Sequence, residues 1–305
     1  MRRAATAVAL ALLTIACTRT PLTSPGPRVT SSSSPSPLGS SPTVSPRAFL
    51  PDPDRPVPGR AADLASDLVT TTRELHSAID RWLDAGDPWV WPPPEDVELL
   101  ALYQQRLARK LGADPKLLNP TIEKLPARLR GEVRANASAA ANLLSLVHPI
   151  SGPSGFATQR PLTAGALLDY YREAEGRFGV AWEVLAAVNH VESKFGRVRS
   201  ASYAGAQGPM QFIPSTWAAY GLGGDVHDPH DAIMGAANYL RASGAPHDYR
   251  RALYAYNPSN AYVDAVMAYA EQMMDDPHDY YAYYNWQVFV ETTSGSRRLT
   301  GPGLD

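Results

Sequence analysis

Apolar residues recur every three to four positions along most of the chain between residues 61 and 276. Before residue 150 this pattern forms three long stripes, at about 62–84, 95–111 and 126–147, and a glycine or proline follows each of them. Such spacing places the apolar side chains on one face of an α-helix. Residues 61–150 are therefore expected to form a helical bundle. No cluster of titratable residues stands out in this part, so we expect it to have a packing or positioning role.

Residues 151–276 continue the helical spacing in shorter segments. Thr163 can cap the first of these helices and Asp231 a later one, because both side chains accept hydrogen bonds from first-turn N–H groups. Between them, a helix at about 181–195 carries apolar residues on one face and stops at Gly196. The two helical parts together predict an all-α fold.

The last part of the chain, 277–305, changes its period. Trp286, Val288 and Val290 occupy every second position, and a Ser-Gly pair follows them, which predicts a small C-terminal β-hairpin. Six aromatic side chains crowd this segment, and we expect them to pack over the preceding helices rather than to extend a binding surface. They are Tyr280, Tyr281, Tyr283, Tyr284, Trp286 and Phe289.

The first residues predict export from the cytoplasm. Two arginines precede an apolar run of about a dozen residues, which is too short to span a bilayer and is typical of a secretory signal. Cys17, the only cysteine, follows this run. The segment LTIAC resembles the lipobox of bacterial lipoproteins, which implies a signal peptide at 1–17 and a lipid anchor on Cys17 at the outer face of the cytoplasmic membrane. The alternative is ordinary cleavage and secretion into the cell wall.

Residues 18–60 are rich in proline, serine and threonine and poor in large apolar residues. Such a stretch buries too little surface to offset the entropy lost on ordering, so we expect a disordered tether. The whole chain has 28 basic and 30 acidic residues, a net charge of −2, and no long basic run. This composition gives no reason to expect a nucleic-acid partner.

One carboxylate lies close to the apolar stripe of the helix at 181–195. Glu192 precedes Phe195, a member of that stripe, by three positions and so lies at the edge of the buried face. Burial disfavours the ionised carboxylate and raises its pKa, and a raised pKa suits a general acid. His190 and Lys194 are each two positions from Glu192, so the helix is expected to turn both away, with His190 on the domain surface.

Three further segments follow Glu192 along the chain: AGAQGPMQFIPSTW, DPHDAIMGAANYL and YAYNPSNAYV. Together with the Glu192-Ser193 pair, this series resembles the lytic transglycosylases that cleave bacterial peptidoglycan. The segment GPMQ at 208–211 is similar to the family's Gly-Leu-Met-Gln segment, and AYN at 255–257 to its Ala-Tyr-Asn segment. Pro209 in place of leucine makes the chain most similar to the membrane-bound lytic transglycosylase B type.

This resemblance covers about residues 160–275 and implies a lysozyme-like catalytic domain at 151–276, whose cleft binds peptidoglycan glycan strands. It implies that Glu192 acts first as an acid and then as a base. The C6 hydroxyl of muramic acid then attacks its own C1, and a 1,6-anhydro ring forms. Because this nucleophile is intramolecular, a second carboxylate is not needed. No cofactor is expected.

The resemblance also implies roles for residues around the glycan. Ser193 orients Glu192 or a glycan hydroxyl, or else bonds its own backbone. Gly208 allows close approach of the backbone to the sugar, or else only gives the loop flexibility. Met210 packs under a sugar ring, and Gln211 bonds the polar groups of that sugar. The two remaining positions are Tyr256, which bonds Glu192 or lines the cleft, and Asn257, which holds its loop in place.

Two other activities fit the same residues. A muramidase on this fold would hydrolyse the same bond with water, and an inactive glycan-binding lipoprotein would retain the cleft without the reaction. The acidic and histidine residues in GGDVHDPHDA, at 223–232, lack the twelve-residue pattern of a calcium loop. We expect turn and helix-cap roles for them and no metal.

Overall fold

The computed structural model describes residues 49–153 and 155–304. The expected signal peptide with Cys17, and most of the expected tether, lie outside these residues. The described chain is mostly helical, with one two-stranded antiparallel sheet, so the predicted all-α fold with a small hairpin is confirmed. Within the same residues, no helix is both long and apolar enough to cross a membrane.

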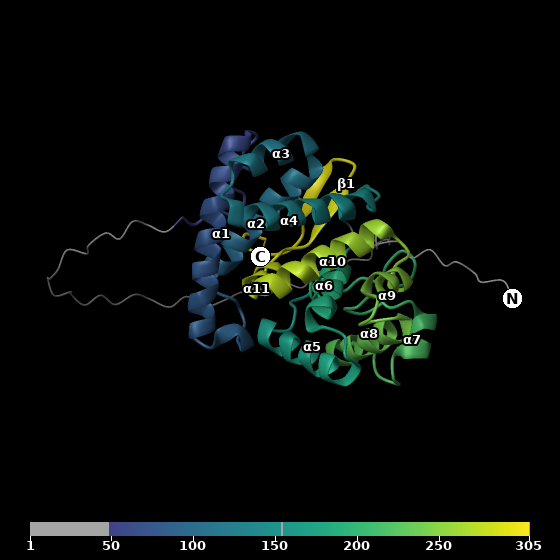
Figure 1. Cartoon of the computed structure of the whole chain (residues 1–305). Helices are drawn as coiled ribbons and strands as arrows, with labels where there is room; N and C mark the ends of the chain where they lie inside the picture. Colours follow the sequence, from purple (N-terminus) through teal and green to yellow (C-terminus); the bar gives the residue numbers. More distant parts are fainter. Residues whose placement is uncertain (1–48, 154, 305) are drawn as a thin grey trace, which may run out of the picture.

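The N-terminal part is a helical bundle, coloured purple to teal in Figure 1. Helix α2 packs against α1 on one side and α4 on the other, and α3 closes the end between α1 and α4. Helix α3 was not predicted, because Pro115 at its start and Pro120 inside it resemble breaks between helices. The bounds are α1 Ala61–Asp84, η1 (a 3₁₀ turn) Asp87–Trp89, α2 Glu95–Ala113, α3 Pro115–Lys124 and α4 Ala127–Ser145.

Six helices follow within residues 155–276: α5 Ala164–Phe178, α6 Trp182–Ser193, α7 Pro214–Tyr220, α8 Pro229–Ser243, α9 Tyr249–Tyr256 and α10 Asn260–Asp275. Thr163 caps α5 as predicted, since its hydroxyl accepts the N–H of Ala166 at 3.4 Å. The prediction that Asp231 caps α8 is wrong, because the helix begins one turn earlier. Asp228 caps this helix by accepting the N–H of Asp231, and Asp231 in turn accepts the N–H of Asp225.

Helix α10 joins the two helical parts. It packs against α4 of the bundle and against α6, which lies behind it in Figure 1. Both parts contribute to one apolar core, in which Leu75 and Leu100 of the bundle cluster with Val188 of α6 and Val266 of α10. The bundle therefore packs against α10, which in turn packs against α6, the helix that carries Glu192.

The C-terminal tail covers this shared core. Helix α11, His278–Tyr284, was not predicted because its run of tyrosines has no helical apolar period. Tyr280, Tyr283, Tyr284 and Trp286 are buried, so the prediction that these aromatic side chains pack over the helices is confirmed.

The hairpin follows, with β1 at Phe289–Thr292 and β2 at Gly295–Arg298. Phe289 pairs with Arg298 across it. The hairpin lies against the bundle, and Ile150 after α4 bridges to Thr292 (Figure 1). The sheet thereby places Phe289 and its neighbours beside the end of α6.

Residues 49–60, which the composition assigned to the tether, lie against the bundle. The guanidinium of Arg55 stacks 4.8 Å from the ring centroid of Phe49, and Arg106 of α2 donates to the carbonyl of Pro53 at 2.9 Å. Pro51 is buried. These contacts extend the packed part of the chain twelve residues upstream of α1.

Candidate active site

Glu192 is the penultimate residue of α6, directly before a strained turn. The helix ends at Ser193, and Lys194 and Phe195 both adopt positive φ angles, 53° and 59°. Two successive non-glycine residues in this region cost conformational energy that the surrounding packing must offset. Phe195 is fully buried and anchors the turn. Such strain is common at functional sites, where a side chain must be held in one place.

Among the residues that the structure describes, the carboxylate of Glu192 has one hydrogen-bonded side-chain partner, the hydroxyl of Tyr262 near the start of α10. Tyr262 Oη donates to Glu192 Oε1 at 2.7 Å, and the tyrosine ring is fully buried. The sequence resemblance instead implied that Tyr256 bonds Glu192 or lines the cleft. Tyr256 Oη donates to the carbonyl of Met210 at 2.6 Å. Tyr262 is thus a site residue that the sequence did not identify.

Burial raises the pKa of Glu192 to about 7. The hydrogen bond from Tyr262 and the positive charge of Lys194 act in the opposite direction, because both favour the ionised carboxylate. The side chain is only partly exposed, which fits a group at the bottom of a concave site that water can still reach. The predicted elevation of this pKa is confirmed.

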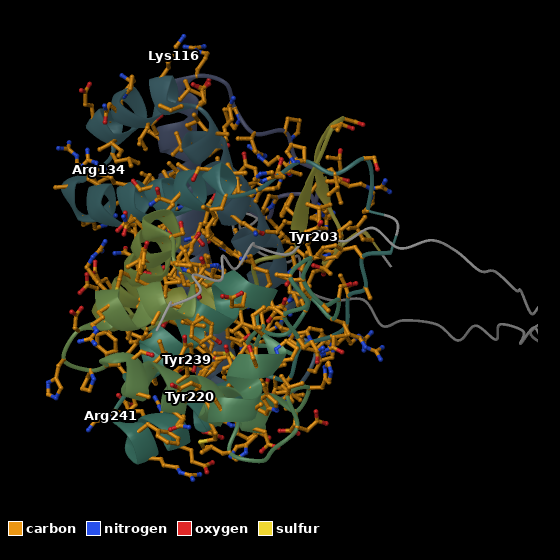
Figure 2. The ribbon with its side chains drawn as sticks, turned by 90° about the vertical axis from the view of Figure 1, so that its right-hand side faces the viewer. Lys116, Arg134, Tyr203, Tyr220, Tyr239 and Arg241 are labelled. Atoms are coloured by element: carbon orange, nitrogen blue, oxygen red, sulfur yellow. The ribbon has the colours of Figure 1, made fainter. Side chains whose placement is uncertain are left out.

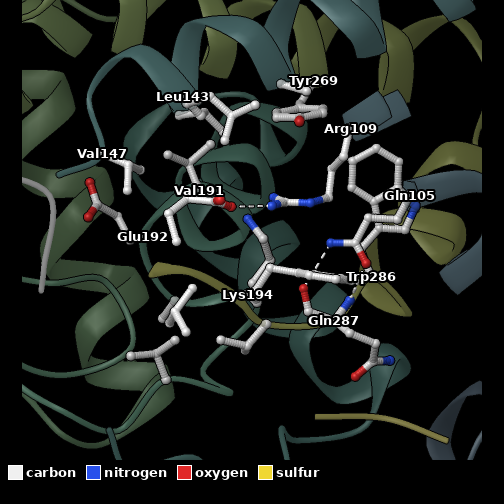
Figure 3. A pocket seen from close by; sticks show the side chains of 18 of the residues that line it. Gln105, Arg109, Leu143, Val147, Val191, Glu192, Lys194, Tyr269, Trp286 and Gln287 are labelled. Carbon is white, nitrogen blue, oxygen red and sulfur yellow. Dashed lines mark hydrogen bonds and ion pairs between the residues drawn. The ribbon is translucent and has the colours of Figure 1, made fainter. Parts of the chain in front are cut away.

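Glu192 lies at the edge of a cavity of about 150 Å³ between α6, the bundle and the hairpin. In Figure 3 its carboxylate points to one side of the cavity, near Val147, while Lys194 and Arg109 occupy the middle. Leu143 and Val147 form the wall on the α4 side. The hairpin and the residues before it contribute Trp286, Gln287, Val288, Phe289, Val290 and Glu291. Parts of the chain far from Glu192 in sequence therefore build this side of the site.

Glu291 is the second carboxylate among the described residues that line the cavity, and it is already paired. The guanidinium of Arg109, on α2, forms an ion pair with Glu291, donates to Ser296 Oγ at 2.8 Å and stacks 4.5 Å from the ring centroid of Phe289. The carboxylate of Glu291 is therefore engaged by the guanidinium of Arg109. Glu192, whose pKa burial raises, is the candidate acid catalyst at this cavity.

Lys194 points into the cavity, so the prediction that the helix turns it away is wrong. The helical geometry used for that prediction ends at Ser193, one residue earlier. Lys194 Nζ donates to the carbonyl of His190 at 2.8 Å. Burial, helped by the nearby charge of Arg109, lowers the pKa of Lys194 to about 7, while Glu192 acts to raise it.

His190 is fully buried, so its predicted place on the surface is also wrong. Its ring lies among four aromatic rings, with centroid distances of 4.7 Å to Tyr269, 5.4 Å to Phe195, 5.5 Å to Tyr283 and 5.6 Å to Trp286. Burial holds its pKa well below the usual value, so the ring is neutral and acts as part of the core. The tail covers the face of α6 that was expected to meet solvent.

Ser193 ties the end of α6 to the GPMQ segment. Its hydroxyl donates to the carbonyl of Pro209 and accepts the N–H of Gly196 at 2.8 Å. It also lies 3.0 Å from Oδ1 of Asn189, one turn earlier. These bonds fix the backbone on both sides of the site rather than the carboxylate of Glu192 itself.

The GPMQ segment forms a tight turn next to α6. Gly208 has a φ of +73°, and a Cβ there would lie 1.8 Å from the carbonyl oxygen of Val226. Met210 is fully buried, and Gln211 is mostly buried with a φ of 51°. Gln211 Nε2 donates to the carbonyl of Gly208 at 2.9 Å. The glycine is thus required for a close approach of two backbone segments.

Asn257 follows α9 and is 4% exposed. Its N–H donates to the carbonyl of Leu253, which closes the last turn of that helix. Three aromatic rings lie in a row next to Asn257. The ring centroids of Tyr256 and Tyr239 are 5.6 Å apart, and those of Tyr239 and Tyr220 are 4.7 Å apart. Figure 2 shows Tyr220 and Tyr239 next to each other on the lower half of the molecule.

A helical fold that holds a carboxylic acid of raised pKa beside a cavity is consistent with a lysozyme-like fold and with acid catalysis. Residues 169–276 match the family model of the transglycosylase SLT domain. The match includes Glu192, Tyr262 and the GPMQ and AYN segments. It excludes Arg109, α4 and the hairpin, which complete the cavity.

One similar curated protein is the membrane-bound lytic murein transglycosylase F of Thiobacillus denitrificans. It is 26% identical over 134 residues, which cover 41% of this chain and 28% of that protein. The match thus spans less than a third of the relative's length. No solved structure matches the chain. Both similarities support a lytic transglycosylase, and the expected likeness to the B type stays a prediction.

Proposed function

We propose that this protein cleaves the β-1,4 bond between N-acetylmuramic acid and N-acetylglucosamine in peptidoglycan, without water, and leaves a 1,6-anhydro-muramic acid end. The observation that carries this proposal is Glu192, a carboxylic acid whose pKa is raised to about 7 and whose one direct side-chain partner is the hydroxyl of Tyr262. Its position inside a transglycosylase SLT domain supports the same activity.

Glu192 supplies the proton for bond cleavage. Tyr262 donates to Oε1, so the acidic proton resides on Oε2, the oxygen left free for the glycosidic oxygen. When that proton moves to the leaving sugar, the new carboxylate keeps the hydrogen bond from Tyr262, which favours the ionised form. The same tyrosine therefore holds the acid in place before the step and stabilises its conjugate base afterwards.

The ionised Glu192 then takes the proton of the muramic acid C6 hydroxyl, whose oxygen attacks C1 and closes the anhydro ring. An attacking group on the same sugar has a high effective molarity and needs no carboxylate to position a water molecule. Glu291 is bound by Arg109 and is not free for that second role. An inverting or retaining hydrolase would need such a second carboxylate.

The remaining predicted residues shape the glycan site around Glu192. We assign Ser193 and Gly208 to the backbone framework that fixes the GPMQ segment against α6. We assign Met210 and Tyr256, which are buried and joined by a hydrogen bond, to the support of the glycan site, and Gln211 and Asn257 to polar contacts with the glycan. The neighbouring rings of Tyr220 and Tyr239 provide apolar faces of the kind on which sugars stack.

We further propose that the protein works outside the cytoplasm, held at the membrane by lipidated Cys17. The apolar run before Cys17 and the proline- and serine-rich residues after it support this location, and peptidoglycan is an extracytoplasmic polymer. Expression of the full chain and of a Cys17→Ala variant, followed by detergent phase partitioning, tests the anchor. Equal partitioning of both proteins into the aqueous phase would contradict it.

The activity is tested by digesting purified peptidoglycan and determining the masses of the released fragments. Fragments that end in anhydro-muramic acid are expected from the wild type, and none from Glu192→Gln. Reducing muramic acid ends throughout would identify a muramidase instead. Release of no fragment by either protein, with the glycan still bound, would identify an inactive glycan-binding protein.

A further inference from the structure

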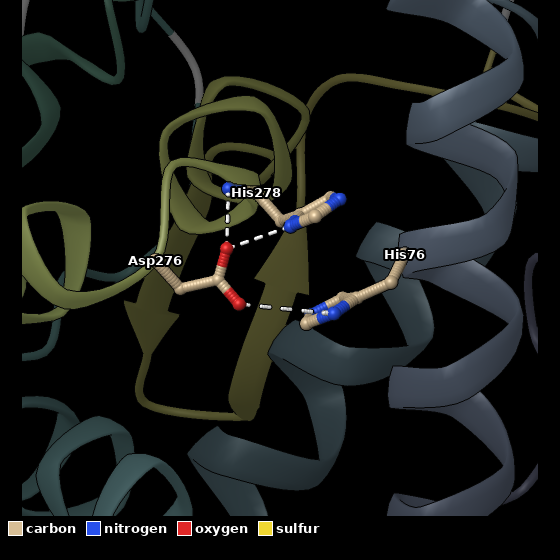
Figure 4. A group of neighbouring side chains, drawn as sticks. All are labelled: His76, Asp276 and His278. Carbon is tan, nitrogen blue, oxygen red and sulfur yellow. Dashed lines mark hydrogen bonds and ion pairs between the residues drawn. The ribbon is translucent and has the colours of Figure 1, made fainter.

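A second group of titratable side chains joins the bundle to the C-terminal helices. His76 comes from α1, Asp276 follows α10, and His278 begins α11 (Figure 4). Each side chain offers one ligand atom, and the three atoms lie within 4.8 Å of one another. We propose that these residues bind a divalent transition-metal ion of the Zn²⁺ type, which clasps α1 to the turn between α10 and α11.

The separations within the group suit one small ion. His278 Nδ1 lies 2.6 Å from Asp276 Oδ1, and His76 Nδ1 lies 3.9 Å from Asp276 Oδ2. Ligands around a tetrahedral ion with bonds of about 2.0–2.1 Å lie roughly 3.4 Å apart, a value between these two. The imidazole rings are parallel, with centroids 4.5 Å apart, so modest rotations about the side-chain bonds direct both Nδ1 atoms at a common point.

Asp80 supplies the supporting contact that metal-binding histidines need. Its carboxylate lies 2.8 Å from His278 Nε2, the ring nitrogen that faces away from Asp276. A carboxylate that accepts the Nε2 proton fixes the tautomer in which Nδ1 carries a free lone pair. Asp80 is four residues after His76 on α1, so both project from one face of that helix.

The donor atoms select the type of ion. Two imidazole nitrogens and one carboxylate oxygen suit Zn²⁺ and its transition-metal neighbours, whereas Ca²⁺ and Mg²⁺ prefer ligand sets made of oxygen. The side chains of His76, Asp276 and His278 are 28%, 41% and 27% exposed, so an ion can reach them from solvent. Three protein ligands leave a fourth position for water.

The elements that carry the ligands are held by core packing. Ile79 and Trp82 of α1 are buried, and the indole of Trp82 packs edge-on against Tyr281 of α11 with centroids 5.6 Å apart. This contact fixes α1 and α11 next to each other on the inner side of the group. Ligands on packed helices are positioned more accurately than ligands on loops.

A second cluster, Asp228, His230 and Asp231, meets the same distance criterion and makes a matched control. Its two carboxylates already accept backbone N–H groups, Asp228 at the start of α8 and Asp231 from Asp225. His230 Nε2 lies 3.1 Å from Glu173. Asp276 also accepts a backbone N–H, that of His278 through Oδ1, but its Oδ2 faces His76. The second cluster offers only one imidazole, and a metal there would compete with the bonds of two carboxylates, so the His76 group is the preferred site.

The test is Zn²⁺ titration of the full chain by calorimetry at pH 7.5, without a histidine tag. Every protein carries Cys17→Ser so that the one cysteine does not bind zinc. We expect one ion per chain with a Kd at or below about 10 µM. His76→Asn and His278→Asn each weaken binding by at least about tenfold, Asp80→Asn weakens it by about 10–100-fold, and His230→Asn leaves it unchanged.

Two further readouts distinguish coordination from a fold defect. Co²⁺ in the same site gives the visible absorption bands of a low-coordinate ion in the wild type and not in the His76→Asn variant. Saturating Zn²⁺ raises Tm by about 5 °C in the wild type and the His230→Asn variant only. Zinc binding that persists in a His76→Asn/His278→Asn double variant, or that is absent from the folded wild type at 100 µM Zn²⁺, would overturn the proposal.

Discussion

Tyr262 Oη donates to Glu192 Oε1 at 2.7 Å, and this bond joins the start of α10 to the end of α6. Helix α10 is also the element that packs against α4 of the bundle. The bundle, through α10, therefore bears on the position of the hydroxyl that holds the proposed catalytic acid. The two helical parts act as one scaffold for a single carboxyl group.

Replacement of Tyr262 by phenylalanine removes this hydrogen bond and little else from the site. Because the bond lowers the pKa of Glu192, the pKa should rise further in Tyr262→Phe. A hydrogen bond to a charged group is worth about 1.5–3 kcal/mol, so kcat should fall by roughly 10- to 100-fold. Peptidoglycan turbidity assays and NMR titration of Glu192 measure the two effects.

Tyr256→Phe is the matched control, since that hydroxyl bonds the carbonyl of Met210 and not Glu192. It should lower stability and leave the pKa of Glu192 unchanged. If Tyr256→Phe moves that pKa and Tyr262→Phe does not, the assignment of the partner is wrong.

The rate of cleavage should depend on the protonated fraction of Glu192. With a pKa raised to about 7, half of the free enzyme carries the proton near neutral pH. Above that pH, kcat/KM should fall about tenfold per pH unit. Initial rates on peptidoglycan between pH 5 and 9 give the profile. A rate that stays constant up to pH 9 would argue against Glu192 as the acid.

The same shift has a consequence for stability. The folded state keeps a proton on Glu192 that the unfolded chain loses near pH 4.5, so stability is present below that pH and is lost as the pH rises toward about 7. Glu192→Gln removes this loss and should be more stable than the wild type at pH 8, by at most about 3 kcal/mol. Urea unfolding at pH 4 and pH 8 checks this, and equal stability differences at both pH values would contradict it.

Glu291→Gln tests whether one carboxylate is sufficient. Glu291 lines the cavity but is paired with Arg109, so its neutral amide should change kcat by less than about threefold and leave the anhydro product in place. Some stability is lost, because Arg109 then lacks its partner. A loss of activity as large as that of Glu192→Gln would make Glu291 a second catalytic group.

The sequence located Glu192 because its helical period and its neighbouring motifs are both local. The predictions from the sequence were wrong where segments distant in the chain determine the surroundings of a side chain. His190 was placed on the surface since the tail that covers α6 lies some 90 residues further along the chain. The side chain of Lys194 was predicted to point away from Glu192 because the helix was assumed to continue through residues that in fact have positive φ angles.

The role of Tyr262 was missed, although its side chain is fully buried in α10. A helical period gives the face of a side chain but not the partner of its hydroxyl. The available signal was chemical, since a buried tyrosine hydroxyl requires a hydrogen-bond partner. Arg109 and the hairpin carried no signal of this kind, because only the packed fold brings them beside Glu192.

Alanine substitutions at two glycines in the loop after α6 distinguish the cost of backbone strain from the cost of a steric clash. Gly205 and Gly208 have similar φ angles, +78° and +73°, so alanine at either position pays the same left-handed penalty of about 1–2 kcal/mol. Only at position 208 would the new Cβ meet backbone, at 1.8 Å from the carbonyl oxygen of Val226; at position 205 nothing lies within 4 Å. Gly208→Ala should therefore destabilise the protein by at least about 2 kcal/mol more than Gly205→Ala, and it should displace the GPMQ segment. Thermal unfolding of both variants measures the difference. If the two lose equal stability and Gly208→Ala alone loses glycan binding, the glycine serves the sugar rather than the Val226 contact.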